Sequence, residues 1–193
     1  MIDLSLPIAN GMPVYPGDME PRIQRLDTPS IIEAGWVAHW MTISLHAATH
    51  IEAPAHSVEG GKMLDEFPLE SFSGEATTIA WGDIGHYKVN TPMLFVYSGA
   101  DKWWGNQKYF SPTPLTELEA EWIASLNIRI LGMDIISVGN VNIHRMLQIK
   151  NILLAESMCN LEMLLYKRAK AYLFPLRIKD TEASPVRAVA EIL

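Results

Sequence analysis

Three of the six histidines in this sequence fall within one short segment, His46-Ala-Ala-Thr-His50-Ile-Glu52-Ala-Pro-Ala-His56. Its three histidines and its glutamate all stand at even positions, so on an extended chain their side chains point to one face. Pro54 argues against a continuous helix. Imidazole and carboxylate groups together form a ligand set that suits zinc or manganese. The segment therefore predicts a divalent metal site.

The spacing of the first two histidines also predicts a bend. A straight strand would separate the Cα atoms of His46 and His50 by about 13 Å. Two imidazoles that meet one ion at about 2.1 Å need their backbones closer than that. Ala47, Ala48 and Ala53 are small enough to let the chain curl. We therefore expect a strand that breaks into a loop near His46.

We expect His46, His50 and Glu52 to hold the ion. Two imidazoles and one carboxylate leave a position for water, whose pKa a divalent ion lowers toward about 7. His56 is then free to carry a proton, because an imidazole titrates near pH 6.5. The alternative is a solvated histidine cluster without function, but the shared phase of four ligand-type residues favours the metal site. Zinc is the expected ion, manganese is an alternative, and one or two ions are compatible with the residues.

A second acid and histidine, His144 and Glu156, lie twelve residues apart near the ends of expected elements. If both reach Glu52, a bridging carboxylate could hold two ions. From spacing alone, a solvent-exposed His144 is equally compatible with the sequence.

The order of expected elements favours an α/β or α+β fold over an all-β fold. Apolar and β-branched runs predict strands, and the apolar spacing and acidic start of one segment predict a helix. No linker divides the chain, so we expect a single domain over residues 1–193. Strands are expected at 1–6, 36–45, 74–80, 93–97, 128–133, 152–155, 171–174 and 186–192, helices at 115–126 and 160–170, and loops at 7–22 and 99–112.

Charge and composition exclude several classes of partner. A formal net charge of −7 disfavours nucleic acid, which needs a basic surface. The apolar runs are far shorter than the roughly 20 residues of a membrane span. The first residues carry no basic region and no apolar signal core, so we expect a cytoplasmic protein. The lone Cys159 rules out an internal disulfide and, in its apolar surroundings, favours a packed thiol over a nucleophile.

The chain resembles the cyclase family of metal-dependent hydrolases, which includes bacterial kynurenine formamidases and isatin hydrolase. The family pattern is roughly His-x-Gly-Thr-His-x-Asp-x-Pro-x-His, and residues 46–56 follow it closely. The similarity runs almost from end to end. Its further stretches are Ile2-Asp-Leu-Ser5, Pro13-Val-Tyr-Pro-Gly-Asp18, Leu131-Gly-Met-Asp-Ile-Ile-Ser137, His144 with Glu156, and Ser184-Pro-Val-Arg-Ala188.

This resemblance implies a fold, a ligand set and a reaction class. It implies a swivelling β/β/α fold with a mixed, barrel-like sheet and flanking helices, assembled as a homodimer or a larger homo-oligomer. It implies metal binding by His46, His50 and Glu52, with His56 as the catalytic proton carrier. In the formamidase branch it implies a second zinc, held by Glu52 together with His144 and Glu156. The substrates it implies are small amides, lactams or lactones.

Two residues depart from the family pattern. Ala48 replaces the glycine, which adds a methyl group where the backbone turns tightly. Glu52 replaces the aspartate and is one methylene longer, which moves the ion or the backbone by on the order of 1 Å or changes the mode of carboxylate binding.

The activity we expect is hydrolysis of a C–N bond in a small carbonyl compound, with an arylformamidase-like enzyme as the best single hypothesis. Lactone or lactam ring opening on the same centre is one alternative. A catalytically silent relative that binds a metal or a ligand is another, because of Ala48 and Glu52. Tyr15, Trp103 and Trp104 are candidates for the pocket wall, although core or interface packing explains the two tryptophans equally well.

Overall fold

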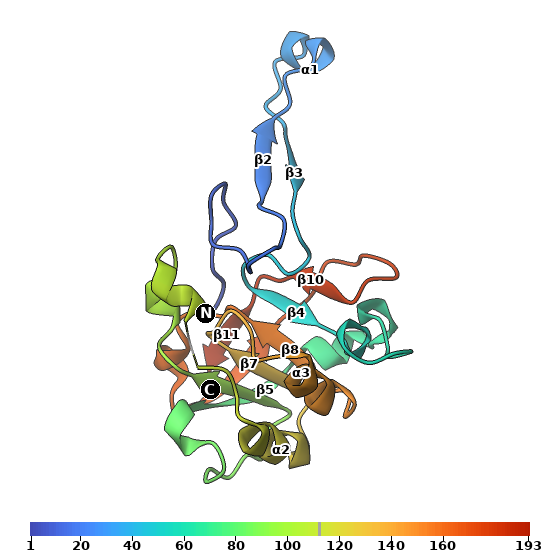
Figure 1. The fold of residues 1–193 in the computed structure, drawn as a ribbon. Coiled ribbons are helices and arrows are strands. Elements are labelled where there is room, and N and C mark those ends of the chain that lie inside the picture. Colours follow the sequence, from blue (N-terminus) through green and yellow to red (C-terminus); the bar gives the residue numbers. More distant parts are fainter. Residues whose placement is uncertain (112) are drawn as a thin grey trace.

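The protein is built around one large, curled sheet in a computed structural model that describes residues 1–111 and 113–193 (Figure 1). Short helical segments and two longer helices connect and cover its strands. The strands are β1 (Ile2–Asp3), β2 (Arg22–Arg25), β3 (His39–Thr42), β4 (His50–Glu52), β5 (Ser73–Ala80), β6 (Met93–Tyr97), β7 (Ile130–Met133), β8 (Leu153–Glu156), β9 (Arg168–Tyr172), β10 (Ala183–Pro185) and β11 (Val189–Ile192). The α-helices are α1 (Pro29–Glu33), α2 (Glu117–Ser125) and α3 (Val141–Gln148), and 3-10 turns span Pro54–His56, Leu64–Glu66, Leu69–Phe72, Trp81–Asp83, Asp101–Trp103, Gln107–Phe110 and Leu161–Leu164.

The main sheet has nine strands in the order β1-β11-β9-β5-β6-β7-β8-β4-β10. β5, β6, β7 and β8 are parallel to one another, and the strands on both flanks pair antiparallel. The sheet curls so far that the chain after β1 meets the chain after β8, where Ser5 pairs with Met158. This mixed, barrel-like sheet with few helices confirms the fold class expected from the sequence.

Two apolar clusters pack on opposite faces of the parallel strands. Alternate residues of β6 point to opposite faces. Met93 and Phe95 join the cluster inside the curl, whereas Leu94 and Val96 pack toward α2 and α3. Because both faces are covered, the central strands are continuously apolar, as expected for buried parallel strands.

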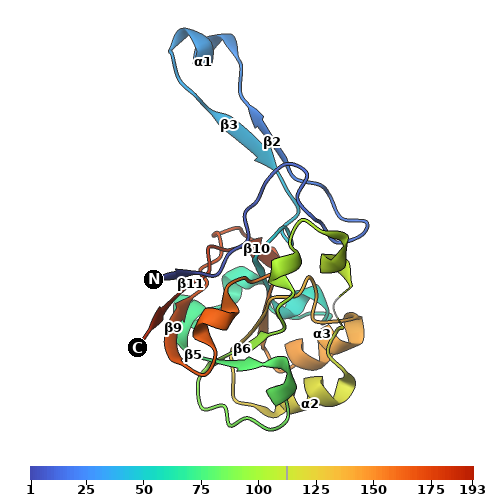
Figure 2. The same cartoon turned by 90° about the vertical axis from the view of Figure 1, so that its left-hand side faces the viewer.

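Residues 22–42 form an arm that stands away from the sheet in both views (Figures 1 and 2). β2 and β3 pair with each other as a separate two-stranded sheet, and α1 closes the far end. The sequence predicts a strand over 36–45 but gives no sign of this projection. The arm begins just after the loop around Tyr15 and leads back to His46.

The predicted helix over 160–170 is wrong. The chain forms only a 3-10 turn at Leu161–Leu164, and Tyr166 has a left-handed backbone with φ 57° that ends it. β9 then follows, with alternating exposed and buried residues that suit a strand. The helix predicted over 115–126 is present as α2, with Thr116 as its N-cap. Among the described residues, no helix is long and apolar enough to cross a membrane.

Cys159 is a packed thiol, as expected. It is free and buried in a small cluster with Leu6 and Met12. Burial raises the pKa of its thiol to about 12, so the nucleophilic thiolate is scarce at neutral pH.

Candidate metal centre

The segment from His46 to His56 is a bent ribbon with three parts. His46 lies in a turn, His50 and Glu52 lie on β4, and His56 ends the 3-10 turn Pro54–His56. Ala48 makes the bend, with a left-handed φ of 53°. The predicted break of the chain into a loop at His46 is therefore present. The bend brings His46, at one end of the segment, and His56, at the other end, close to Glu52 of β4.

Hydrogen bonds from Thr49 fix this bend to the sheet. Its hydroxyl accepts from the backbone N–H of Leu6 at 2.8 Å and donates to the carbonyl of Ser157. Its own carbonyl accepts from the N–H of Val186 at 3.0 Å. Thr49 thus joins the chain after β1, the chain after β8 and the chain after β10 around the turn that carries the histidines.

Neighbouring elements bring the second acid and histidine to the same place. β4 lies between β8 and β10, and its His50 pairs directly with Glu156 of β8. His144 comes from α3 and is buried. Ser57, which follows His56, donates to Gln148 of α3, so the turn that bears His56 is tied to the helix that bears His144.

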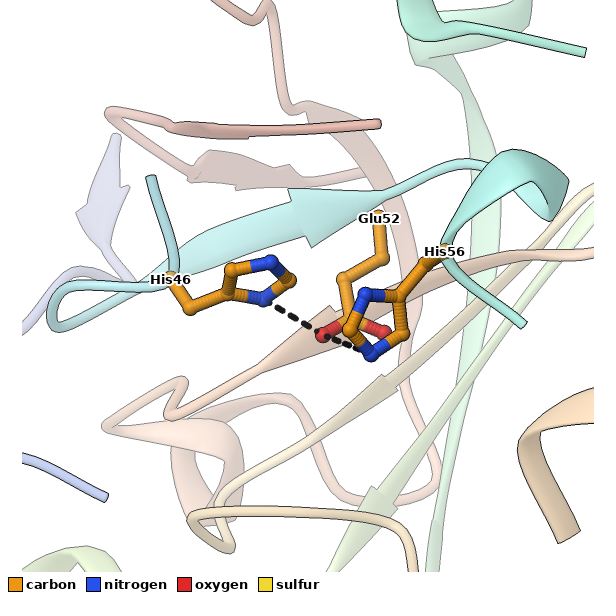
Figure 3. A group of neighbouring side chains, drawn as sticks. All are labelled: His46, Glu52 and His56. Carbon is orange, nitrogen blue, oxygen red and sulfur yellow. Dashed lines mark hydrogen bonds and ion pairs between the residues drawn. The ribbon is translucent and has the colours of Figure 1, made fainter. Parts of the chain in front are cut away.

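All four histidines of the cluster approach the carboxylate of Glu52, and His50 and His144 also approach Glu156. Glu52 is almost completely buried, with 1% exposure, and its Oε1 receives the rings of His46 and His50 at 2.8 and 3.3 Å. His56 Nε2 stands 3.7 Å from the same oxygen. Figure 3 shows His46 and His56 converging on Glu52 from either end of β4. His144 Nε2 lies 3.5 Å from Glu52 Oε2 and 3.4 Å from Glu156 Oε1.

The residues fit a divalent cation. Glu52 Oε2 is buried and has no hydrogen-bond partner, although a carboxylate oxygen removed from water needs one. Two groups of three side chains place their donor atoms within 4.8 Å of one another, and Glu52 belongs to both. One group adds His46 and His56, and the other adds His50 and Glu156. A carboxylate shared in this way is suited to bridging two ions.

These groups divide the residues differently from the sequence expectation. His46 and His50 were expected on one ion, with His56 free, whereas the geometry groups His56 with His46. The assignment of His56 as the proton carrier stays a prediction, as does the exact distribution of the ligands His46, His50, Glu52, His144 and Glu156.

His46, His50 and His144 each have one ring nitrogen turned to the cluster and the other held by an acceptor. Nδ1 of His50 faces the carbonyl of Ala48 at 2.9 Å, and Nδ1 of His144 faces the carbonyl of Asn140 at 3.1 Å. His46 is reversed, with Nδ1 toward Glu52 and Nε2 3.1 Å from the carboxylate of Glu182. Acceptors of this kind orient metal-binding imidazoles and fix their tautomers.

Glu182 is a residue that sequence reasoning missed. It directly precedes β10, which lies beside β4, and the register pairs Ala183 with Glu52. The only sequence signal was its place beside the stretch Ser184–Ala188, which carries part of the family resemblance. A lone glutamate 136 residues from its histidine offers no local pattern.

The pKa values indicate that, without a bound ion, His46 and His144 are protonated and Glu52 is ionised at neutral pH. Burial alone would lower the pKa of His46, but the hydrogen bonds and charges of Glu52 and Glu182 outweigh it and raise this pKa to about 9. Burial likewise opposes protonation of His144, yet Glu156 and Glu52 raise its pKa to about 9. Burial would raise the pKa of Glu52, but its histidine partners hold it well below its usual range. The protons on the two histidines therefore take the place that a cation would fill.

His56 behaves differently. Burial, together with the positive charges of His46 and His144, lowers its pKa despite the attraction of Glu52 and Glu156. Its side chain keeps 34% of its exposure, against 2% for Glu52. His56 is therefore neutral at pH 7 and reachable from outside, as a proton acceptor must be.

The cluster forms the floor of a cavity of about 340 Å³. Tyr15 and Trp104 lie in its wall, together with apolar residues such as Val14 and Ile136. Trp103, the third aromatic candidate, lies beside a different cavity among the described residues, with the ammonium of Lys108 4.1 Å from its ring centre.

The family model described as "Putative cyclase" matches residues 2–140, and the chain belongs to this Cyclase family. An uncharacterized protein of Methanocaldococcus jannaschii is 31% identical over 91% of both chains. A kynurenine formamidase of Bordetella avium is 28% identical over 97% of this chain and 95% of its own. The family resemblance seen in the sequence is thus confirmed.

Solved structures agree with the fold. An isatin hydrolase bound to the product analogue thioisatinate superposes with a TM-score of 0.83 at 18% identity, over 100% of this chain and 91% of its own. A protein described as a potential metal-dependent hydrolase with cyclase activity superposes with a TM-score of 0.81 at 23% identity, over 97% and 95% of the two chains. At these identities the superpositions establish the fold.

Proposed function

We propose that this protein is a metal-dependent hydrolase that cleaves the C–N bond of a small, aromatic amide, with arylformamidase-like activity. The observation that carries the proposal is the buried carboxylate of Glu52, on which four histidines converge at the floor of a cavity. The kynurenine formamidase among its relatives supports the reaction class. The description of one structural neighbour as a metal-dependent hydrolase agrees with the ligand set.

The ligands for the proposed ion or ion pair are His46, His50, Glu52, His144 and Glu156. A divalent ion there would activate water and stabilise negative charge on the substrate carbonyl oxygen. The donor set suits zinc best and manganese as an alternative.

His56 is the proposed proton carrier. In its neutral form its Nε2 accepts a proton from the attacking water, and in its charged form it returns the proton to the leaving nitrogen. Its lowered pKa keeps the accepting form populated at pH 7. The negative charge of Glu52, 3.7 Å from Nε2, then stabilises the imidazolium that forms during the reaction.

The cavity wall determines which substrates fit. Its volume of about 340 Å³ lies at the lower end of small-molecule sites. The Tyr15 and Trp104 rings and the apolar side chains of Val14 and Ile136 suit an aromatic ring. An N-formylated arylamine such as N-formylkynurenine combines such a ring with a small amide that can reach the floor.

The test is hydrolysis of N-formylkynurenine by protein of measured zinc and manganese content. His56→Gln is expected to keep its metal and lose about 10²- to 10⁴-fold in kcat. His50→Ala is expected to lose the metal. His86→Gln, an exposed histidine outside the cluster, is the matched control and should change neither. Full metal occupancy in His50→Ala would contradict the proposed ligand set, and unchanged turnover in His56→Gln would remove the proton-carrier role.

Lactam and lactone ring opening is the second candidate reaction, because the same floor can act on any small carbonyl compound and the isatin hydrolase has the same fold. A panel of one aryl formamide, one lactam and one lactone, assayed under the same conditions, separates the two reactions. Metal binding without turnover of any of them would instead favour a silent metal-binding relative.

A further inference from the structure

Asp18 lines the cavity of the metal centre but does not belong to the histidine cluster. Two more carboxylates of this lining, Glu52 and Glu156, lie within 3.7 Å of a ring nitrogen of His50. Asp18 is half-buried in the loop that carries Tyr15, and none of the ion pairs within residues 1–111 and 113–193 involves it. Its negative charge therefore borders the space of a substrate without a cationic partner from the described chain.

A tight turn holds Asp18 beside Tyr15. The N–H of Asp18 donates to the carbonyl of Tyr15 at 2.9 Å, with Pro16 and Gly17 between them. Gly17 has a left-handed φ of 94°, and proline followed by such a glycine is typical of a type II turn. The carboxylate Oδ1 accepts from the N–H of Met19 at 2.8 Å, which orients the side chain. The hydrogen bonds of the described residues do not use Oδ2, which is therefore available to a ligand.

The lining of this cavity contains no lysine and no arginine among the residues that the structure describes. Its histidines face the carboxylates of Glu52 and Glu156 on the floor, so the positive charges there are already compensated. The wall that surrounds the floor thus carries charge of one sign only, at Asp18. A cavity wall with a fixed negative charge favours cationic ligands and disfavours anionic ones.

We infer that Asp18 selects substrates that carry a protonated amine on a short side chain of the aromatic ring, through an ion pair with its carboxylate. This inference rests on the proposed function, because it names the substrate class of the same site. Tyr15 and Trp104 contact the ring in that proposal, and Asp18 lies on the same turn as Tyr15. The inferred class is therefore aryl formamides with an alkylammonium side chain.

The same lining gives no reason for a carboxylate on the substrate. Without a lysine or an arginine in the described wall, a side-chain carboxylate gains no ion pair there. N-formylkynurenine carries both an ammonium group and a carboxylate, whereas N-formylkynuramine carries the ammonium group alone. We therefore expect N-formylkynuramine to have a KM no higher than that of N-formylkynurenine.

Binding of the hydrolysis products tests the inference without any turnover. Kynuramine carries the ammonium group, and 2-aminoacetophenone is the same aryl ketone without the aminomethyl group. Calorimetric titration of zinc-loaded protein should give kynuramine a dissociation constant about 10-fold lower, a usual contribution of a hydrogen bond to a charged group. In Asp18→Asn the two dissociation constants should become equal. Asparagine keeps an oxygen that can accept from the N–H of Met19, so the variant keeps the turn.

Glu20→Gln is the matched control, because Glu20 is exposed, lies two residues from Asp18 and is not part of the lining. It removes the same charge from the same loop and should keep the preference for kynuramine. An equal loss of preference in both variants would overturn the inference in favour of a general charge effect. Equal affinities in the wild type would also overturn it. A preference that survives in Asp18→Asn would do so as well, and would indicate that the amine binds the metal.

Hydrolysis of the parent formamides separates this inference from the proposed function. The pair is N-formylkynuramine and N-(2-acetylphenyl)formamide, which lacks only the aminomethyl group. The ratio of their kcat/KM values should fall about 10-fold from wild type to Asp18→Asn, through the KM of the amine. Hydrolysis of both with the same ratio in both proteins would contradict the role of Asp18 and leave the proposed reaction standing. No hydrolysis of either, with the kynuramine preference intact, would contradict the reaction and support the amine site.

Discussion

Glu182 lies far along the chain from His46, the first histidine of the proposed ligand set, yet the two side chains are in contact. Its carboxylate accepts from Nε2 of His46, which leaves Nδ1 turned toward Glu52. We expect Glu182→Gln to lower affinity for zinc or manganese about 10-fold and Glu182→Ala up to about 100-fold, as for other carboxylates that orient a ligand imidazole. Competition with a coloured chelator measures this affinity without any enzyme assay.

Asp180→Asn is the control for Glu182→Gln. Asp180 lies two residues away, is 75% exposed and contacts only Lys179 among ion-pair partners in the described chain. It undergoes the same change from acid to amide beside the same strand. Equal loss of affinity in both variants would show that Glu182 acts only through the general charge of the region and not by holding His46.

Ala48 is the second residue with a testable structural role. The family pattern has glycine there, and the structure gives Ala48 the left-handed φ of 53° that a glycine adopts freely. We expect Ala48→Gly to be more stable to urea than Ala47→Gly by about 1–2 kcal/mol, the cost of a left-handed backbone for an L-residue.

The comparison with Ala47→Gly isolates the energetic cost of the left-handed backbone at Ala48. Ala47 is buried in the same small cluster but has no positive φ, so its change to glycine loses a similar methyl contact and gains the same freedom in the unfolded chain. Equal midpoints for the two variants would mean that the turn stores no strain. The departure from the family pattern at this position would then have no energetic consequence.

At the scale of elements, the sequence predicted best where a pattern was local. Strands β5, β6, β7 and β8 and helix α2 were placed within one to two residues, because continuous apolar runs and a 3.6-residue repeat are local signals. The bend between His46 and His50 followed from metal geometry alone. The helix α3, which carries His144, was missed, although Asn140 caps it and accepts from two backbone N–H groups.

The errors at this scale have a common cause. Residues 160–170 were predicted as a helix, but the alternation of Arg168, Ala169, Lys170 and Ala171 is that of a strand exposed on one face. β9 pairs with β5 and β11, and such long-range pairing cannot be seen in a local window. The same reason hides the contacts of Glu182, whereas the approach of His144 to Glu52 was anticipated only through the family resemblance.

Gly132 of β7 marks the place where the central strands pack most tightly. A Cβ atom there would stand 2.5 Å from the sulfur of Met158 and 2.6 Å from the ring of Phe95. We expect Gly132→Ala to destabilise the protein by about 1–3 kcal/mol, the usual result of overpacking a core. Thermal or urea unfolding measures it.

Gly82→Ala is the matched control, because a Cβ atom at Gly82 meets nothing within 4 Å and its backbone does not require glycine. It should leave stability unchanged or raise it slightly. If Gly132→Ala were equally neutral, Met158 and Phe95 would have to move aside without cost. The packing between β7 and the chain after β8, beside Glu156, would then be looser than the structure indicates.

At the scale of the whole molecule, the large sheet was predictable as a class and the arm was not. Mixed strand and helix signals indicated an α/β fold, and the family resemblance supplied its barrel-like form. The arm has ordinary local patterns, and only its distance from the rest of the chain distinguishes it.

The metal centre should link the stability of the whole chain to pH. Without an ion, His46 and His144 have pKa values of about 9, above the 6.5 of an unfolded histidine. Each proton stabilises the folded state fully below pH 6.5, and this contribution is lost as the pH rises toward 9. We therefore expect the melting temperature of metal-free protein to fall between pH 6.5 and 9.

A bound ion should reverse this trend, because it requires unprotonated nitrogens and takes the place of both protons. The gain in melting temperature on adding zinc or manganese should grow from pH 6.5 to 9, as measured by scanning calorimetry with chelator or with excess metal. The double variant His46→Gln/His144→Gln should flatten the slope of the metal-free protein, whereas His86→Gln should leave it unchanged. A metal-induced gain that is constant across this range would mean that the ion does not displace these protons and binds elsewhere.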